Sequence, residues 1–396
     1  MPFVEAAIPT LSSTVLARPT AIAPWYFRLL VFGATCIPIG ALWDISWHST
    51  IGRDTFWTPA HIVTYMGGLI PGLVCGWLAL KTHFFGSESE RAAAVSFWGF
   101  RAPIGAWVTI WGAFTMLLSA PFDDWWHNTY GLDVEILSPP HSLLAAGMFF
   151  VATGVLLLMV SLQNRSPDTE NHGRFLFIFT GGIMLLMAAV FLTEKSFPNQ
   201  HRSAEFYRAA AITYPLYLAA LARASKLRWP ATIAAGVYTG VLLLLIWILP
   251  LFPAEPKLAP IYNPVDHMVP PAFPVLLVVP AIGIDLLMRF PGRRSGWLRD
   301  SALAVGLALV FLALFMPVQW WFSKFLLSPA ADNWFFAGGE WMPYASKPGP
   351  WIHSYWPTAA KEHIVPFKQL LWIGLFAVIS SRVGLAFGTW MSRVKR

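Results

Sequence analysis

The chain has 396 residues, of which 56% are apolar and only 12% are charged, and its mean hydropathy is +0.56. These values exclude an ordinary soluble domain and place the chain with integral membrane proteins. The net charge of +7 is explained by basic loops on one side of a membrane, so nucleic acid is not expected as a partner.

A helix needs about 20 apolar residues to cross a bilayer. The sequence predicts an all-α integral membrane protein, a polytopic bundle of about ten transmembrane helices surrounded by membrane lipid. The expected spans are 26–43, 62–82, 103–120, 141–163, 174–193, 208–224, 229–250, 270–288, 298–321 and 367–390.

Three regions follow from this pattern. Residues 1–25 form an N-terminal tail without the apolar core of a signal peptide. Residues 26–165 form a four-helix membrane unit that carries a duplicated motif. Residues 166–396 add further membrane helices and a long loop at about 322–366 that is rich in Trp, Pro and Gly.

Lys and Arg concentrate in alternate loops, for example at Arg165, Lys226, Arg228 and Arg293. Cytoplasmic loops carry such an excess, so both termini are expected in the cytoplasm. The duplicated motif then lies on the outward face. In a bacterium this is the periplasmic side of the inner or an intracytoplasmic membrane.

The duplicated motif is the most informative feature of the chain. Each copy reads D-x2-W-H-x-T-x-G-x-D and then [ST]-P-x-H, and the second copy follows the first by about 80 positions. The corresponding residues are Asp44, His48, Asp54 and His61 in the first copy, and Asp123, His127, Asp133 and His141 in the second.

The spacing of these residues predicts two metal sites. Asp44 and His48 are four residues apart, so they share a face if they lie in the last turn of a helix. His61 follows at the start of the next helix, since Pro59 suits a first turn. One carboxylate and two imidazoles fit copper, zinc or iron. The alternative is that these residues are interfacial and bind nothing.

Asp54 and Asp133 are candidates for a supporting role behind the ligands, in which each accepts a hydrogen bond from a histidine and fixes its tautomer, or else they are helix or turn caps. The outer residues His201 and His267 lie in loops without the spacing of the motif. They are expected to be structural.

The first copy resembles the copper-site stretch in the C-type subunit of the copper membrane monooxygenases, the family of particulate methane monooxygenase and ammonia monooxygenase. Arg53, Asp54, Thr55, Thr58 and Pro59 match the context of that stretch, as do the ligand positions. The second copy resembles the other metal site of the same type of subunit, although Asp123 stands where the family usually has Asn. The match covers roughly residues 26–165.

The resemblance implies a copper-binding subunit that helps to oxidise a small apolar molecule, such as methane, a short alkane or ammonia, with O₂. It also implies A-like and B-like monooxygenase subunits as partners, in a multi-subunit and trimeric assembly, because this chain has neither of their sequence patterns. Residues 170–396 do not align with the family.

Two other functions remain open. One is a non-catalytic membrane protein that binds copper or zinc as a carrier, sensor or assembly factor. The other is a transporter, for which the sequence offers neither a carboxylate pair at mid-membrane nor an evident interrupted helix.

Overall fold

The computed structural model describes residues 24–131, 138–165, 172–290, 296–338, 342–344 and 365–395. Asp133, almost all of the predicted tail at 1–25 and much of the predicted loop at 322–366 lie outside these ranges.

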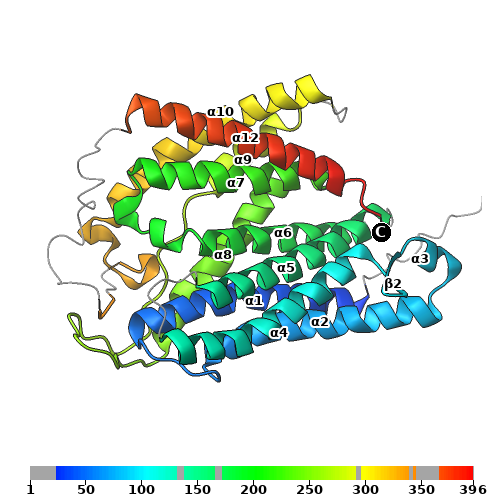
Figure 1. Cartoon of the computed structure of the whole chain (residues 1–396). Helices are drawn as coiled ribbons and strands as arrows, with labels where there is room; N and C mark the ends of the chain where they lie inside the picture. The colour runs from blue at the N-terminus through cyan, green and yellow to red at the C-terminus, as the bar shows by residue number, and fades with distance from the viewer. Residues whose placement is uncertain are drawn as a thin grey trace, which may run out of the picture.

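Long helices run side by side along one direction (Figure 1). Within the described residues, eight helices are long and apolar enough to cross a membrane, which confirms a helical integral membrane protein. They are α1 (Trp25–Thr50), α2 (Pro59–Phe85), α4 (Ile104–Tyr130), α5 (Pro139–Arg165), α6 (His172–Val190), α8 (Pro230–Ile248), α10 (Trp297–Leu326) and α12 (Phe367–Met391).

Two of the ten predicted spans differ from this set. The span 208–224 forms a helix, α7 (Ala204–Ala224), which is less apolar than the other eight. The span 270–288 is helical only in α9 (Val278–Leu287). Pro270, Pro271 and Pro274 explain this difference, because each lacks an N–H donor and restricts the residue before it.

Short elements join the long helices. In the described ranges, five 3₁₀ turns lie between or after them: η1 (Thr193–Lys195), η2 (Pro198–Gln200), η3 (Leu249–Leu251), η4 (Pro329–Ala331) and η5 (Trp334–Phe336). A short helix α3 (Glu88–Ala92) and an antiparallel hairpin of β1 (Val95–Phe97) and β2 (Phe100–Ala102) connect α2 to α4. The sequence had not predicted this hairpin.

Glycines allow α4 and α5 to pack closely. A Cβ atom on Gly112 would lie 2.8 Å from the Gly147 carbonyl oxygen, and one on Gly147 would lie 2.9 Å from that of Gly112. Small residues at such contacts are typical of membrane helices, where close packing replaces the hydrophobic effect. The helix pair that carries the second copy is therefore held by backbone approach.

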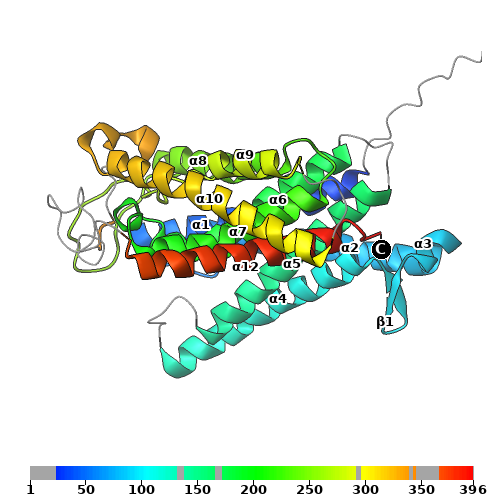
Figure 2. The same ribbon diagram turned by 90° about the horizontal axis from the view of Figure 1, so that it is seen from above.

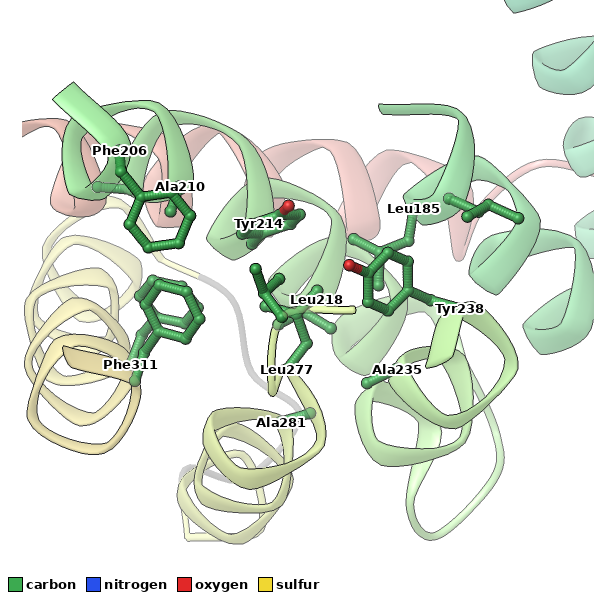
Figure 3. Close-up of a cluster of buried hydrophobic side chains, with 14 of the residues drawn as sticks. Leu185, Phe206, Ala210, Tyr214, Leu218, Ala235, Tyr238, Leu277, Ala281 and Phe311 are labelled. Carbon is green, nitrogen blue, oxygen red and sulfur yellow. The ribbon is translucent and has the colours of Figure 1, made fainter. Parts of the chain in front are cut away.

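The second half of the chain is built around α7. Tyr214 and Leu218 of α7 contact side chains from α8 and α9, and Phe206 faces Phe311 of α10 (Figure 3). Because other helices cover α7, it does not need a fully apolar surface. This explains why its composition is the least membrane-like of the long helices.

The described chain begins and ends at one end of the bundle. Arg165 at the end of α5 lies within electrostatic range of Tyr26, and Asn164 donates to the carbonyl oxygens of Met391 and Val394 at 2.9 Å. The loops of the duplicated motif connect α1 to α2 and α4 to α5 at the opposite end (Figure 1).

Candidate metal centre

The first copy forms where α1 ends and α2 begins. Asp44 and His48 lie in the last two turns of α1, Asp54 lies in the connecting loop, and His61 lies in the first turn of α2. Pro59 is the first residue of α2, as its fixed φ and missing N–H favour. The predicted placement of both histidines on helix ends is confirmed.

The four side chains converge on one point. His61 Nε2 lies 3.0 Å from Asp44 Oδ1 and 3.2 Å from Asp54 Oδ2, and His48 Nε2 lies 3.7 Å and 3.4 Å from the same two carboxylates. One ligand atom from each of the four residues lies within 4.8 Å of all the others. The first copy can therefore offer two imidazole nitrogens and two carboxylate oxygens to one ion.

The hydrogen bond made by Nδ1 of His61 determines which ring nitrogen faces the point where the four side chains converge. His61 Nδ1 lies 2.9 Å from the Thr55 carbonyl oxygen, which can only accept, so Nδ1 carries the proton. Nε2 of the neutral ring then directs a lone pair at the carboxylates. Asp44 Oδ1 is buried and makes no hydrogen bond of normal geometry. Lone pairs that face one another in this way fit a shared cation or proton.

Asp54 lies beside the candidate ligands and not behind a histidine. Its carboxylate approaches the Nε2 atoms, whereas a residue that fixes the tautomer would contact Nδ1. When both histidines are protonated, the hydrogen bond to His48 lowers the pKa of Asp54 below its ordinary value, and the charges of His48 and His61 add to this effect. The ionised carboxylate is the form that binds a metal.

The second copy repeats this arrangement with fewer described residues. Asp123 and His127 lie in the last turns of α4, and His141 lies in the first turn of α5. Asp123 Oδ1 lies 3.4 Å from His127 Nε2 and 3.6 Å from His141 Nε2. It is buried and, like Asp44 Oδ1, has no hydrogen bond of normal geometry. His127 Nδ1 lies 3.0 Å from the Gly131 carbonyl oxygen, so Nε2 again faces the carboxylate.

These donor sets restrict the metal. Imidazole nitrogen with carboxylate oxygen suits copper(II), zinc, iron(II) or manganese, whereas thiolate or thioether ligands would favour copper(I). Two carboxylates in the first copy also add negative charge that favours a divalent ion. The residues of both copies therefore fit the predicted copper and equally fit zinc or iron.

The second half of the chain encloses the loop of the first copy. The Tyr344 hydroxyl donates to the Ile51 carbonyl oxygen at 2.6 Å and accepts from the Lys257 and Leu258 amides at 2.9 and 3.1 Å. The Lys257 amide also donates to Ile51, at 3.0 Å. Three chain segments thus meet at one hydroxyl beside the metal loop.

A non-helical segment, residues 268–276, supports the end of α1. The Val269 amide donates to Thr50 Oγ1 at 2.9 Å, and the Ser46 hydroxyl donates to the Val269 carbonyl oxygen. Both hydroxyls are buried, on the turn that follows Asp44 and flanks His48. Non-helical backbone at such depth is tolerated where protein satisfies its polar groups.

His201 anchors the other end of this segment. His201 Nε2 donates to the Ser196 carbonyl oxygen at 2.9 Å, and its Nδ1 accepts from the Gln319 amide at 2.9 Å. Gln319 Oε1 in turn accepts from the Leu276 amide at 2.9 Å. Burial lowers the pKa of His201 to about 3, so the ring is neutral and supports the fold from a buried position.

Other predicted residues have clear places. Trp47 donates from Nε1 to the Arg53 carbonyl oxygen at 2.8 Å and so shapes the metal loop. His267 pairs with Asp266 at 2.7 Å, apart from either copy.

Sequence reasoning missed Tyr65. It follows His61 by one turn of α2, with ring centroids 6.1 Å apart, and lies within electrostatic range of Asp44, Asp54 and Asp123. Tyr65 therefore lies near carboxylates of both copies. Its spacing of four residues from a predicted ligand could have identified it.

Comparison with known proteins does not assign the chain to a family. Protein-family models, curated proteins and solved structures were each searched, and none matched this chain. The resemblance to the C-type monooxygenase subunit rests on the motifs and stays a prediction.

Proposed function

We propose that this protein is the copper-binding subunit of a membrane monooxygenase that oxidises a small apolar molecule, such as methane, a short alkane or ammonia, with O₂. The observation that carries the proposal is the convergence of Asp44, His48, Asp54 and His61 within 4.8 Å, repeated in part by Asp123, His127 and His141. The resemblance to the C-type monooxygenase subunit supports copper as the metal.

In such an enzyme, bound copper would pass electrons from an external reductant to O₂. The residues of this chain would bind and orient it: Thr55 and Gly131 hold the Nδ1 protons, so that the Nε2 atoms face the metal. Apolar and aromatic side chains around α1 and α2 would give a small apolar substrate access from the bilayer. A-like and B-like subunits, in a trimeric assembly, would complete the enzyme.

The proposed topology follows the distribution of basic residues. Ten crossings place both termini in the cytoplasm, if α7 and the segment that includes α9 each cross once. Both copies then face the periplasm of a bacterial inner or intracytoplasmic membrane.

One observation favours a second function. Four protein ligands leave little room for a substrate at the metal. Sites with a complete set of protein ligands are usually structural and not catalytic. A non-catalytic copper or zinc carrier, sensor or assembly protein is therefore the alternative.

Activity measurements separate the two functions. The tagged chain is purified from native membranes in mild detergent with its associated subunits, and O₂ uptake is measured with a reductant and each candidate substrate. If the protein is a monooxygenase subunit, O₂ uptake should depend on the substrate, and His48→Ala or His127→Ala should abolish it. Stoichiometric metal without substrate-dependent uptake in any such preparation would favour the carrier.

A further inference from the structure

The hairpin of β1 and β2 is the feature outside the metal centre that most needs an explanation. It lies at the end of the bundle opposite the metal loops, and Figure 2 shows it pointing sideways from the helices, on the side of α4. It is too small to contribute a core of its own, since an isolated two-stranded hairpin is marginal in water.

Its two faces differ in chemistry. Phe97 pairs with Phe100, and Ser96 pairs with Arg101, so the aromatic pair and the polar pair project to opposite faces. Phe97 packs against Trp107 and Trp111 of α4, with ring centroids 5.5 and 5.8 Å apart. The exposed Arg101 and Ser96 point away from that contact.

The turn holds a bulky residue in an unfavourable conformation. Trp98 and Gly99 have φ values of 48° and 83°, as a two-residue type I′ turn requires. Glycine or asparagine suits both positions, whereas tryptophan with positive φ is an outlier. The Trp98 side chain is 80% exposed. A strained, exposed tryptophan is more readily explained by a binding role than by folding.

The aromatic surface continues onto the outer face of α4. Trp98 contacts Trp111 edge-on at 5.6 Å, and Trp111 contacts Phe114 at 5.8 Å. Phe114 and Leu117 are 52% and 73% exposed on a helix that is apolar enough to span a membrane. The hairpin thus extends the lipid-facing surface sideways at the level where α4 begins.

Positive charge accompanies these rings. Arg91, Arg101 and Lys81 are exposed around the hairpin. The neighbouring acidic groups are Glu88 and Glu90 of α3, and the Glu90 carboxylate is engaged by the Ser87 amide at 2.7 Å. Aromatic rings with Lys and Arg at a helix end are typical of the headgroup layer.

We propose that the Val95–Ala102 hairpin is a lipid-binding element, which inserts Trp98 into the interfacial layer of the bilayer and holds an anionic phospholipid headgroup through Arg101. This site is separate from the metal centre, and it requires no metal.

Depth measurements test the insertion. A spin label is placed at Ser96→Cys in the full chain, in phosphatidylcholine nanodiscs with or without phosphatidylglycerol, while the native Cys36 and Cys75 are buried. The label should be accessible to O₂ and shielded from a water-soluble nickel complex, and Trp98→Asn should remove this shielding. A label at the exposed Ser89→Cys is the matched aqueous control. Equal nickel access at both positions would overturn the proposal.

Lipid analysis tests the headgroup. Phosphatidylglycerol retained by the chain from mixed bilayers should fall about five-fold in Arg101→Gln, because one basic residue near an anionic surface has an effect of that size. Arg299→Gln, at an exposed arginine on α10, should retain the wild-type amount. Equal retention by both variants would overturn the role of Arg101.

A third measurement distinguishes lipid binding from folding or protein docking. Asparagine tolerates positive φ, so Trp98→Asn should leave the Tm in detergent unchanged or raised. A clear fall in Tm would make Trp98 a folding residue and contradict the proposal. Shielding of the label in native membranes, but not in nanodiscs, would show instead that the hairpin docks a protein.

Discussion

The two copies of the motif have the same sequence pattern but different surroundings. The loop of the first copy is enclosed by Tyr344, Lys257 and Val269 of the second half. The second copy lies on the outer ends of α4 and α5, which Figure 2 shows standing apart from the other helices. The repeat therefore places the candidate ligands in both copies, while the unrepeated part of the chain supports the loop of the first copy.

Equivalent glycines show the difference directly. Gly52 and Gly131 both have positive φ, at 84° and 88°. A Cβ atom on Gly52 would lie 2.5 Å from Leu258 and 3.0 Å from the Tyr344 ring, whereas one on Gly131 would meet no described atom within 4 Å. Among the described residues, the glycine with positive φ is thus packed against side chains in the first copy and not in the second.

The largest expected effect comes from Asp54→Asn. Loss of a charged ligand should weaken metal binding to the first copy by about 100-fold or more, since even residues behind the ligands contribute 10–100-fold. Competition with a chelator of known affinity measures this change. Asp124→Asn is the control, because Asp124 is exposed and bonds Asn128. Equal affinity of both variants and the wild type would remove Asp54 from the site.

Alanine substitutions of Gly52 and Gly131 should separate the cost of backbone strain from the cost of overpacking. Gly52→Ala and Gly131→Ala share the penalty of positive φ, but only the first forces a methyl group against Leu258. Gly52→Ala should therefore lower the free energy of unfolding by about 1–3 kcal/mol more than Gly131→Ala. Denaturant titration in mixed detergent micelles measures both. Equal losses would mean that the second half does not enclose the first loop.

The buried Thr50 and its equivalent Thr129 test the support of α1. Thr50→Val leaves the buried Val269 amide without its acceptor and should cost about 1–3 kcal/mol of stability. The Thr129 hydroxyl is exposed and, among the described residues, donates to the Trp125 carbonyl oxygen of its own helix, so Thr129→Val should change stability by less than about 0.5 kcal/mol. A larger loss in Thr129→Val would reverse the comparison.

The last expected effect is a pH dependence of stability through His201. Its pKa falls from the ordinary 6.5 to about 3 on burial, so below pH 6.5 the unfolded chain binds a proton that the folded chain does not. This stabilisation is complete above pH 6.5 and should fall by about 2 kcal/mol by pH 5. Thermal unfolding of the wild type and His201→Gln from pH 7.5 to 5 measures it. The variant should show the flatter profile, and parallel profiles would show that His201 titrates in the folded chain.

Part of this picture could be predicted from the sequence. The candidate ligands of the first copy could be placed on two helix ends. Asp44 and His48 are four residues apart, and helix geometry makes such residues neighbours. Pro59 marks the start of the next helix. The contact of Tyr344 with Ile51 could not be predicted, since it joins residues 293 positions apart through the tertiary fold. The apolar run at 270–277 was mistaken for helix because its hydropathy outweighed its prolines.

Metal analysis of the purified chain tests the central claim most directly. Wild type, His48→Ala and His127→Ala, grown with ample copper, are compared for copper, zinc and iron per chain. The account predicts one copper ion for each copy of the motif, with each substitution removing the ion of its own copy only. Absence of stoichiometric metal from the wild type would contradict it, and the repeat would then be structural.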